Sequence, residues 1–190
     1  MENQIRRTVF VVSICIFGLA QVQASVAQTK HPSLYVDKGI CPGEGCSFEG
    51  TAKVLKRTTA YDNPNLRSAP RFDLSVGEVV SSLKSEVHTV AGRFVVKRDY
   101  EKYRAGDQLW VYTYLGEGNF KVWNRGKMYQ EKLDFSPWGG SMGKRCELNN
   151  GSFCWGELEK ELEMTWWLKV KSKDGRKGWI RVDENLDWQQ

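Results

Sequence analysis

The chain has 190 residues, of which 41% are apolar and 27% charged, and its formal net charge is +5. This length fits one domain that is large enough to bury a single core. The basic excess is mild and spread along the chain, which is not the signature of a nucleic-acid-binding protein, for which a clustered Lys/Arg patch is typical.

Residues 1–24 have the pattern of a secretory signal peptide. Two arginines near the start precede an apolar run at 9–20, and small residues at Ala24 and Ala27 offer alternative cleavage sites. The apolar run is shorter than the roughly 20 residues that a bilayer crossing needs, so a retained anchor is the weaker alternative. We therefore predict an exported protein, periplasmic or secreted, with no integral membrane association after cleavage.

Four cysteines follow the signal segment, and an even number in an exported chain favours disulfides. We favour local pairing, because the Pro-Gly-Glu-Gly sequence between the first two cysteines is turn-forming. Cross-pairing and a four-thiolate zinc site are the alternatives, although neither local spacing is Cys-x-x-Cys. We predict no metal and no cofactor. The cysteines are Cys41, Cys46, Cys146 and Cys154.

The segment from 25 to 50 lacks a sustained hydrophobic period, so we predict a flexible arm, which contains His31, and a glycine-rich cysteine loop. Apolar and polar residues then alternate over 51–61, which predicts a strand. Asp, Asn and Pro at 62–65 predict a turn, because Asp and Asn bond their own backbone and Pro fixes φ. Residues 66–72 are expected to be a loop.

A turn at Gly77 is expected to lead into a second strand through 79–83. A third strand is predicted over 86–97, with a break at Ala91 and Gly92. The charged segment 98–107 is expected to be a surface loop.

The most regular pattern in the chain is the β-meander predicted over 108–131. Its first strand consists mostly of aromatic and β-branched residues, which suit a pleated, half-buried surface. Glycines at 116 and 118 end this strand, a second strand covers 119–123, and a third begins at Lys127. Strict alternation would place Trp110, Tyr112 and Tyr114 on one face and Leu109, Val111, Thr113 and Leu115 on the other.

Residues 132–152 are rich in Gly, Ser and Asn and are expected to form an irregular insertion. Residues 155–164 fit either a strand or a helical turn. A closing hairpin is predicted over 166–180, with its turn at Asp174-Gly175. Many short strands and no long amphipathic segment together predict an all-β barrel or sandwich.

The closing hairpin resembles the terminal hairpin of bacterial SH3-like (SH3b) domains. The matching residues are Trp166 to Lys171, then Lys173-Asp174-Gly175-Arg176, then Gly178-Trp179-Ile180. Residues 60–64 and 74–83 resemble the family's first strands. The pattern, including the Cys41–Cys46 loop, is also similar to a group of exported bacterial proteins with this domain. The Asn-Val-Arg motif that usually follows the family's first strand is absent.

This resemblance implies a small, strongly bent β-barrel over 51–190, with an elaboration inserted at about 98–163. The inserted segment would hold the meander and a cysteine-bearing loop. A second small barrel in the 105–135 region is the alternative to a single barrel.

Aromatic side chains are the candidate ligand-binding residues, because flat rings stack on sugars or dock extended peptides. Packing of the same rings against the insertion is the competing interpretation. Trp166 and Trp167 point to opposite faces, so at most one of them belongs to the core. Trp138 is a further candidate. The principal candidates are Trp110, Tyr112, Tyr114, Trp123 and Trp167.

Other charged and polar groups give weaker signals. Glutamates at 157, 159, 161 and 163 could gather a cation on a strand face, but a solvated acidic face explains them better. Basic residues between 169 and 177 could contact an anionic wall polymer or lipid head groups, and solvated surface is again the simpler explanation. No nucleophile motif accompanies His88, so a catalytic triad is not supported and no catalytic residue is predicted.

Three functions remain open at this point. The first is a non-catalytic SH3-like module that binds a cell-wall peptide, a glycan or an envelope protein. The second is a structural or assembly protein of the envelope that uses the aromatic face as a subunit interface. The third is a cell-wall hydrolase, which would need a Cys/His or carboxylate pair in a cleft. A fold of this type does not decide between them, because function depends on the site.

Overall fold

The computed structural model describes residues 30–133, 135 and 155–189, and every regular element in these ranges is a β-strand. The all-β prediction is therefore confirmed. A helix able to span a lipid bilayer is not found in this part of the chain. The strands are β1 (Leu34–Lys38), β2 (Thr51–Val54), β3 (Thr58–Tyr61), β4 (Pro70–Leu74), β5 (Val79–Val90), β6 (Gly92–Val96), β7 (Gln108–Gly116), β8 (Asn119–Asn124), β9 (Lys127–Lys132), β10 (Gly156–Lys160), β11 (Glu163–Lys171), β12 (Lys177–Val182) and β13 (Leu186–Gln189).

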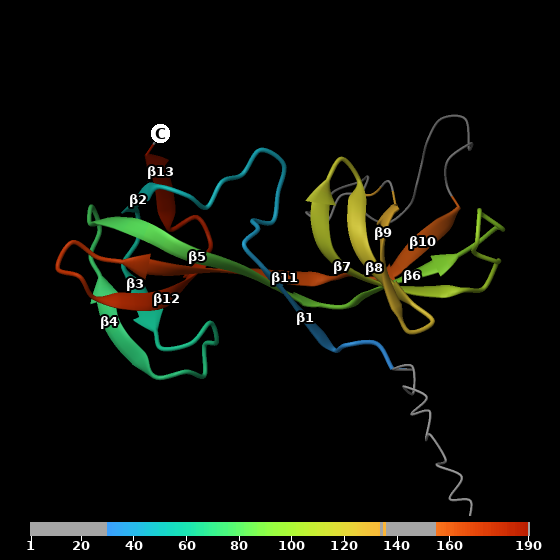
Figure 1. Cartoon of the computed structure of the whole chain (residues 1–190), viewed down its shortest axis with the longest axis horizontal. Coiled ribbons are helices and arrows are strands. Elements are labelled where there is room, and N and C mark those ends of the chain that lie inside the picture. The colour runs from blue at the N-terminus through green and yellow to red at the C-terminus, as the bar shows by residue number, and fades with distance from the viewer. Residues whose placement is uncertain (1–29, 134, 136–154, 190) are drawn as a thin grey trace, which may run out of the picture.

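The first sheet has the strand order β13-β2-β5-β11-β12-β3-β4, and β1 pairs with the second half of β5 (Figure 1). It curls into a half-barrel, so its inward side chains meet around one core. Along β2 and the end of β11 these inward residues alternate with more exposed outward ones, whereas the outward Trp167 and Trp179 are buried as well. The core residues are Ala52, Val54, Ala60, Leu74, Val80, Leu168, Val170 and Ile180.

The second sheet has the order β10-β6-β7-β8-β9 and is built from the chain that runs between β5 and β11 (Figure 1). Its core is more aromatic than the first, and stacked or tilted rings fill it. The Trp155 ring, for example, stacks on that of Tyr103 with centroids 5.3 Å apart, and the Phe120 ring stacks on that of Phe135 at 4.3 Å.

Each sheet with its core forms one lobe of the molecule. β5 and β11 form a long antiparallel ribbon that joins the two lobes (Figure 1). They pair from Ser81 opposite Lys171 to Val90 opposite Glu163. β1 lies along β5 at the end of this ribbon nearer the second sheet. Residues 34–38, which we expected in a flexible arm, are ordered there because they pair with β5 and because Asp37 forms an ion pair with Lys121 on β8.

The strand predictions hold in part. The closing hairpin and the meander are present with their predicted turns. The strand expected over 51–61 is split into β2 and β3 by residues 55–57, and residues 70–74, expected mostly as loop, form β4. The strand expected over 86–97 is divided between the two sheets at Ala91. Its first part is the end of β5 in the first sheet, and its second part is β6, which pairs with β7 and β10 in the second sheet.

A β-bulge changes which residues of β7 share a face. The register against β8 shifts between Val111 and Tyr114, and an extra residue reverses the alternation beyond it. Tyr114 therefore packs in the second core with Leu109 and Val111, while Tyr112 lies in a separate cluster on the opposite face. The prediction that Trp110, Tyr112 and Tyr114 share one face is wrong at Tyr114.

Candidate functional site

The predicted aromatic residues do not form one open surface. Tyr112, Tyr114, Trp123 and Trp167 are buried, with 0%, 8%, 9% and 3% of their surfaces exposed. Trp110 is half-buried. Trp138, Cys146, Cys154 and the predicted signal segment lie outside the described residues.

The chain's own N-terminal segment covers the aromatic cluster of β7 and β8. The His31 ring stacks on that of Trp110, with centroids 3.6 Å apart and planes 15° from parallel, and meets Trp123 edge-on at 6.2 Å. The Tyr112 hydroxyl donates to the Pro32 carbonyl at 2.6 Å. Burial raises the pKa of Tyr112 to about 12, which keeps this donor protonated. Packing against the N-terminal segment thus accounts for the burial of these aromatic rings, and a ligand would have to displace residues 31–35 to reach them.

Strand register instead brings another set of residues together, on the outer face of the β1–β5–β11 ribbon. Directly opposed residues of an antiparallel pair project to the same side. Val90 lies opposite Leu34 on one side and Glu163 on the other. His88 is similarly flanked on β11 by Thr165. One row further along, Trp167 lies between Glu86 and Arg181.

The loop between β3 and β4 borders this face and forms one wall of an open depression of about 420 Å³, which we call the outer groove. This volume is in the range of pockets that hold small molecules. The loop is braced internally: the Asn65 side chain accepts from the Arg67 backbone N–H at 2.9 Å, and the Ser68 hydroxyl accepts from that of Asn63 at 3.0 Å. The groove is lined by Leu34, Pro64, Asn65, Leu66, Arg67, His88, Val90, Glu163, Thr165, Trp167 and Arg181.

Three large apolar side chains are left exposed at the outer groove. Leu34, Leu66 and Val90 are 49%, 54% and 37% exposed, and they come from β1, the β3–β4 loop and β5. Scattered exposed apolar residues are normal, but convergence on one concavity is informative. Trp167 forms part of the floor and is supported edge-on by the Tyr61 ring at 6.1 Å.

Charged groups lie at the borders of the outer groove. Neither the Arg67 guanidinium nor the Glu163 carboxylate has a side-chain partner among the described residues. Arg181 bonds Asp183 at 2.7 Å. The two free groups provide opposite charges that could orient a bound molecule.

His88 and Glu86 form a hydrogen-bonded pair next to the groove floor, at 3.0 Å between Nε2 and Oε2. A pair of this kind can position a ligand hydroxyl or amide, and it can relay a proton when a nucleophile is adjacent. In the described chain no hydroxyl or thiol is hydrogen-bonded to His88. His88 therefore provides a polar contact at the outer groove.

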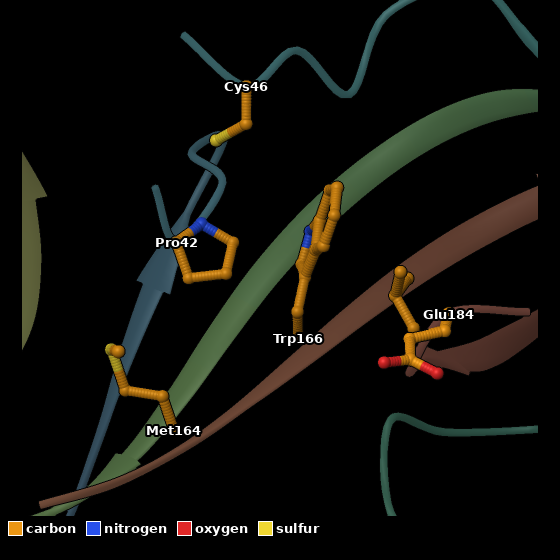
Figure 2. Close-up of a pocket in the computed structure, with 6 residues that line it drawn as sticks. Pro42, Cys46, Met164, Trp166 and Glu184 are labelled. Atoms are coloured by element: carbon orange, nitrogen blue, oxygen red, sulfur yellow. The ribbon is translucent and has the colours of Figure 1, made fainter. Parts of the chain in front are cut away.

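A second, smaller pocket of about 290 Å³ lies on the other face of the same ribbon. Figure 2 shows Trp166 standing between Pro42 of the cysteine loop and Glu184. The Trp166 indole N–H donates to Ser85 Oγ at 2.8 Å, and Glu184 pairs with Lys56 at 3.5 Å. The indole N–H and the carboxylate that line this second pocket are thus already paired with other residues of the protein.

The Cys41–Cys46 loop connects the two lobes. Cys41 and Cys46 form the predicted local disulfide. Between them, the Glu44 carboxylate accepts hydrogen bonds from the Tyr114 hydroxyl and from the backbone N–H of Glu117 in the second lobe. These donors, the hydroxyl first, hold the pKa of the Glu44 carboxyl below its usual value. The loop therefore acts as a strap between the ribbon and the β7–β8 turn.

Sequence reasoning missed most residues of the outer groove. Of the five aromatic candidates, only Trp167 lines it. Leu34 and Leu66 stand in segments without a sustained hydrophobic period, and the meeting of Leu34 with Val90 depends on long-range pairing of β1 with β5. The usable signals were the alternation of the closing hairpin, which separates Trp167 from Trp166, and the Asp-Asn-Pro-Asn turn, which marks a rigid loop at 62–65.

Comparison with known proteins identifies no relative: no family model, no curated protein and no solved structure matches this chain.

Proposed function

We propose that this protein is an exported, non-catalytic binding module of the SH3-like type that its closing hairpin resembles. In this proposal the outer groove holds an extended peptide segment of a cell-envelope protein or of the cell wall. The observation that carries it is the convergence of Leu34, Leu66 and Val90 on one concavity whose wall is a braced loop.

The dimensions of the groove favour an extended peptide. Its floor runs along β11 from Glu163 to Trp167, which is four residue steps or about 13 Å. The lining combines exposed apolar side chains with the charged groups of Arg67 and Glu163, so an extended segment could contact both kinds of group at once. The Cys41–Cys46 disulfide supports export, because disulfides persist in oxidising compartments.

The test compares the exported chain with two matched variants. Leu66→Ser changes a groove residue that is 54% exposed, and Val76→Ser changes a residue that is 67% exposed and lines neither pocket. Both substitutions should leave the fold intact, which unfolding midpoints would verify. Each protein is applied to an immobilised array of synthetic twelve-residue peptides and, separately, to purified peptidoglycan.

The expected result is a set of peptides bound by the wild type and by Val76→Ser but weakened about tenfold or more in Leu66→Ser, since a buried leucine side chain contributes about 1.5–3 kcal/mol. Retention on peptidoglycan with the same sensitivity would identify a wall peptide. Equal binding by both variants, or no binding in either arm, would contradict the proposal.

A further inference from the structure

The face that carries the outer groove continues past it along β11. Alternate residues of this strand project to the same side, and in order they are Glu163, Thr165, Trp167, Lys169 and Lys171. The face therefore begins with an acid, passes through the groove floor and ends with two lysines. The lysine end extends the face by a further ~13 Å beyond Trp167.

Neighbouring strands add two lysines to this end. Lys84 on β5 lies directly opposite Lys169, and Lys177 on β12 lies directly opposite Lys171. We call these four residues the lysine ladder. Lys84, Lys171 and Lys177 are exposed, and Lys169 is half-buried with its ammonium group 5.9 Å from the centre of the Trp179 ring.

Within the described part of the chain, the lysine ladder is left without a counter-charge. None of its four ammonium groups has a carboxylate partner among the described residues, whereas nearby cations do: Arg57 bonds Asp73 and Arg176 bonds Asp174, each at 2.6 Å. Like charges directly opposite each other on a sheet are destabilising. An acidic ligand would relieve this repulsion and form new ion pairs at the same time.

We propose that the ligand of the outer groove is an extended peptide in which a short apolar block is followed by acidic residues. The apolar block occupies the groove, and the acidic side chains pair with the lysine ladder. This inference rests on the function proposed above and specifies its ligand.

The geometry favours a peptide over an anionic polymer. Successive rows of the ladder are two residues apart on β11, or ~7 Å, and alternate side chains of an extended peptide repeat at the same distance. The ladder also continues a face that has an apolar concavity, which a uniformly charged polymer would leave unfilled. At the opposite end of that face, Glu163 would repel an acidic residue, so the peptide has a defined direction.

The experiment measures binding of three fluorescein-labelled peptides by anisotropy. Each has the same four-residue apolar block of Leu, Val and Pro, followed by four glutamates, four glutamines or four lysines. A fourth probe, polyglutamate, lacks the apolar block. Affinities are measured for the wild type, for Lys84→Glu/Lys171→Glu, and for a control, Lys127→Glu/Lys160→Glu, which changes the net charge equally at exposed positions of the second sheet.

The expected order of affinity is glutamate, then glutamine, then lysine peptide. Each ladder pair should contribute about two- to fivefold at low salt, and the preference should shrink as salt is raised. The ladder variant should lose about tenfold for the glutamate peptide and little for the glutamine peptide, and the control should resemble the wild type.

Equal binding of glutamate and glutamine peptides would overturn the inference but leave the groove function standing. Polyglutamate binding as tightly as the apolar–acidic peptide would also overturn it, because the ladder would then act without the groove. Failure of every peptide to bind would count against the proposed function itself.

Discussion

The ion pair between Asp37 and Lys121 fastens β1 to the second sheet and allows a quantitative test. The Asp37 side chain is 6% exposed and that of Lys121 28% exposed, and Asp37 Oδ2 has no hydrogen-bond partner. Removing one partner of a buried pair leaves an uncompensated charge, which typically costs about 3–5 kcal/mol. Because solvent reaches Lys121, we expect Lys121→Met to cost about 3 kcal/mol, at the lower end of that range.

The double variant Asp37→Asn/Lys121→Met removes both charges. It should be less destabilised than Lys121→Met alone, since replacing both members of a buried pair is often nearly neutral. Urea unfolding would be followed by tryptophan fluorescence and by circular dichroism, and coincident transitions would validate a two-state analysis. A cost of Lys121→Met below about 1 kcal/mol, or a double variant as unstable as the sum of the single ones, would refute the reasoning.

Three further predictions concern packing, acid and alkali. A Cβ added at Gly156 would lie 2.2 Å from a ring carbon of buried Phe94, so Gly156→Ala should cost about 1–3 kcal/mol in urea unfolding, whereas Gly43→Ala, with its nearest atom at 3.8 Å, should change stability by less than about 0.5 kcal/mol. Because the pKa of Glu44 is lowered in the fold, its contribution is present at neutral pH and is lost as pH falls through and below the ordinary carboxyl range. The unfolding free energy of Glu44→Gln should accordingly depend less on pH in this range than that of the wild type. Tyr112→Phe should cost about 1 kcal/mol of unfolding free energy at neutral pH, because it removes the hydrogen bond to Pro32. In the wild type, stability should fall as pH rises from about 10 to about 12, because the unfolded tyrosine ionises there while the folded one stays protonated. Tyr112→Phe should lack this loss.

The parts of the fold that sequence predicts well are local. Asp174-Gly175 between two alternating strands specifies a hairpin, and the glycines at 116 and 118 specify the turn of the meander. β4 was missed because Pro70 and its charged neighbours resemble a loop, and its order depends on pairing with β3. β1 was missed for the same kind of reason, because its order comes from β5 and from the Asp37 ion pair.

The candidate site was harder to predict than the fold. A run of aromatic residues cannot show whether another segment covers it, and here His31 and Pro32 cover the Trp110 and Tyr112 rings. The β7 bulge also moved Tyr114 to the opposite face, which strict alternation does not anticipate. The lysines of the closing hairpin were visible in the sequence, but their alignment with Lys84 and with the groove required the register of β5 against β11.

The most direct test of the account is to map where the apolar–glutamate peptide binds on the isotope-labelled exported chain by NMR titration. We predict that the amide signals that shift are those of the β3–β4 loop around Leu66, of β5 near Val90 and of β11 from Glu163 to Lys171, with saturation at one peptide per chain. Shifts confined to the pocket around Trp166 or to the second sheet, or no shifts at all, would contradict the assignment of the outer groove as the binding site.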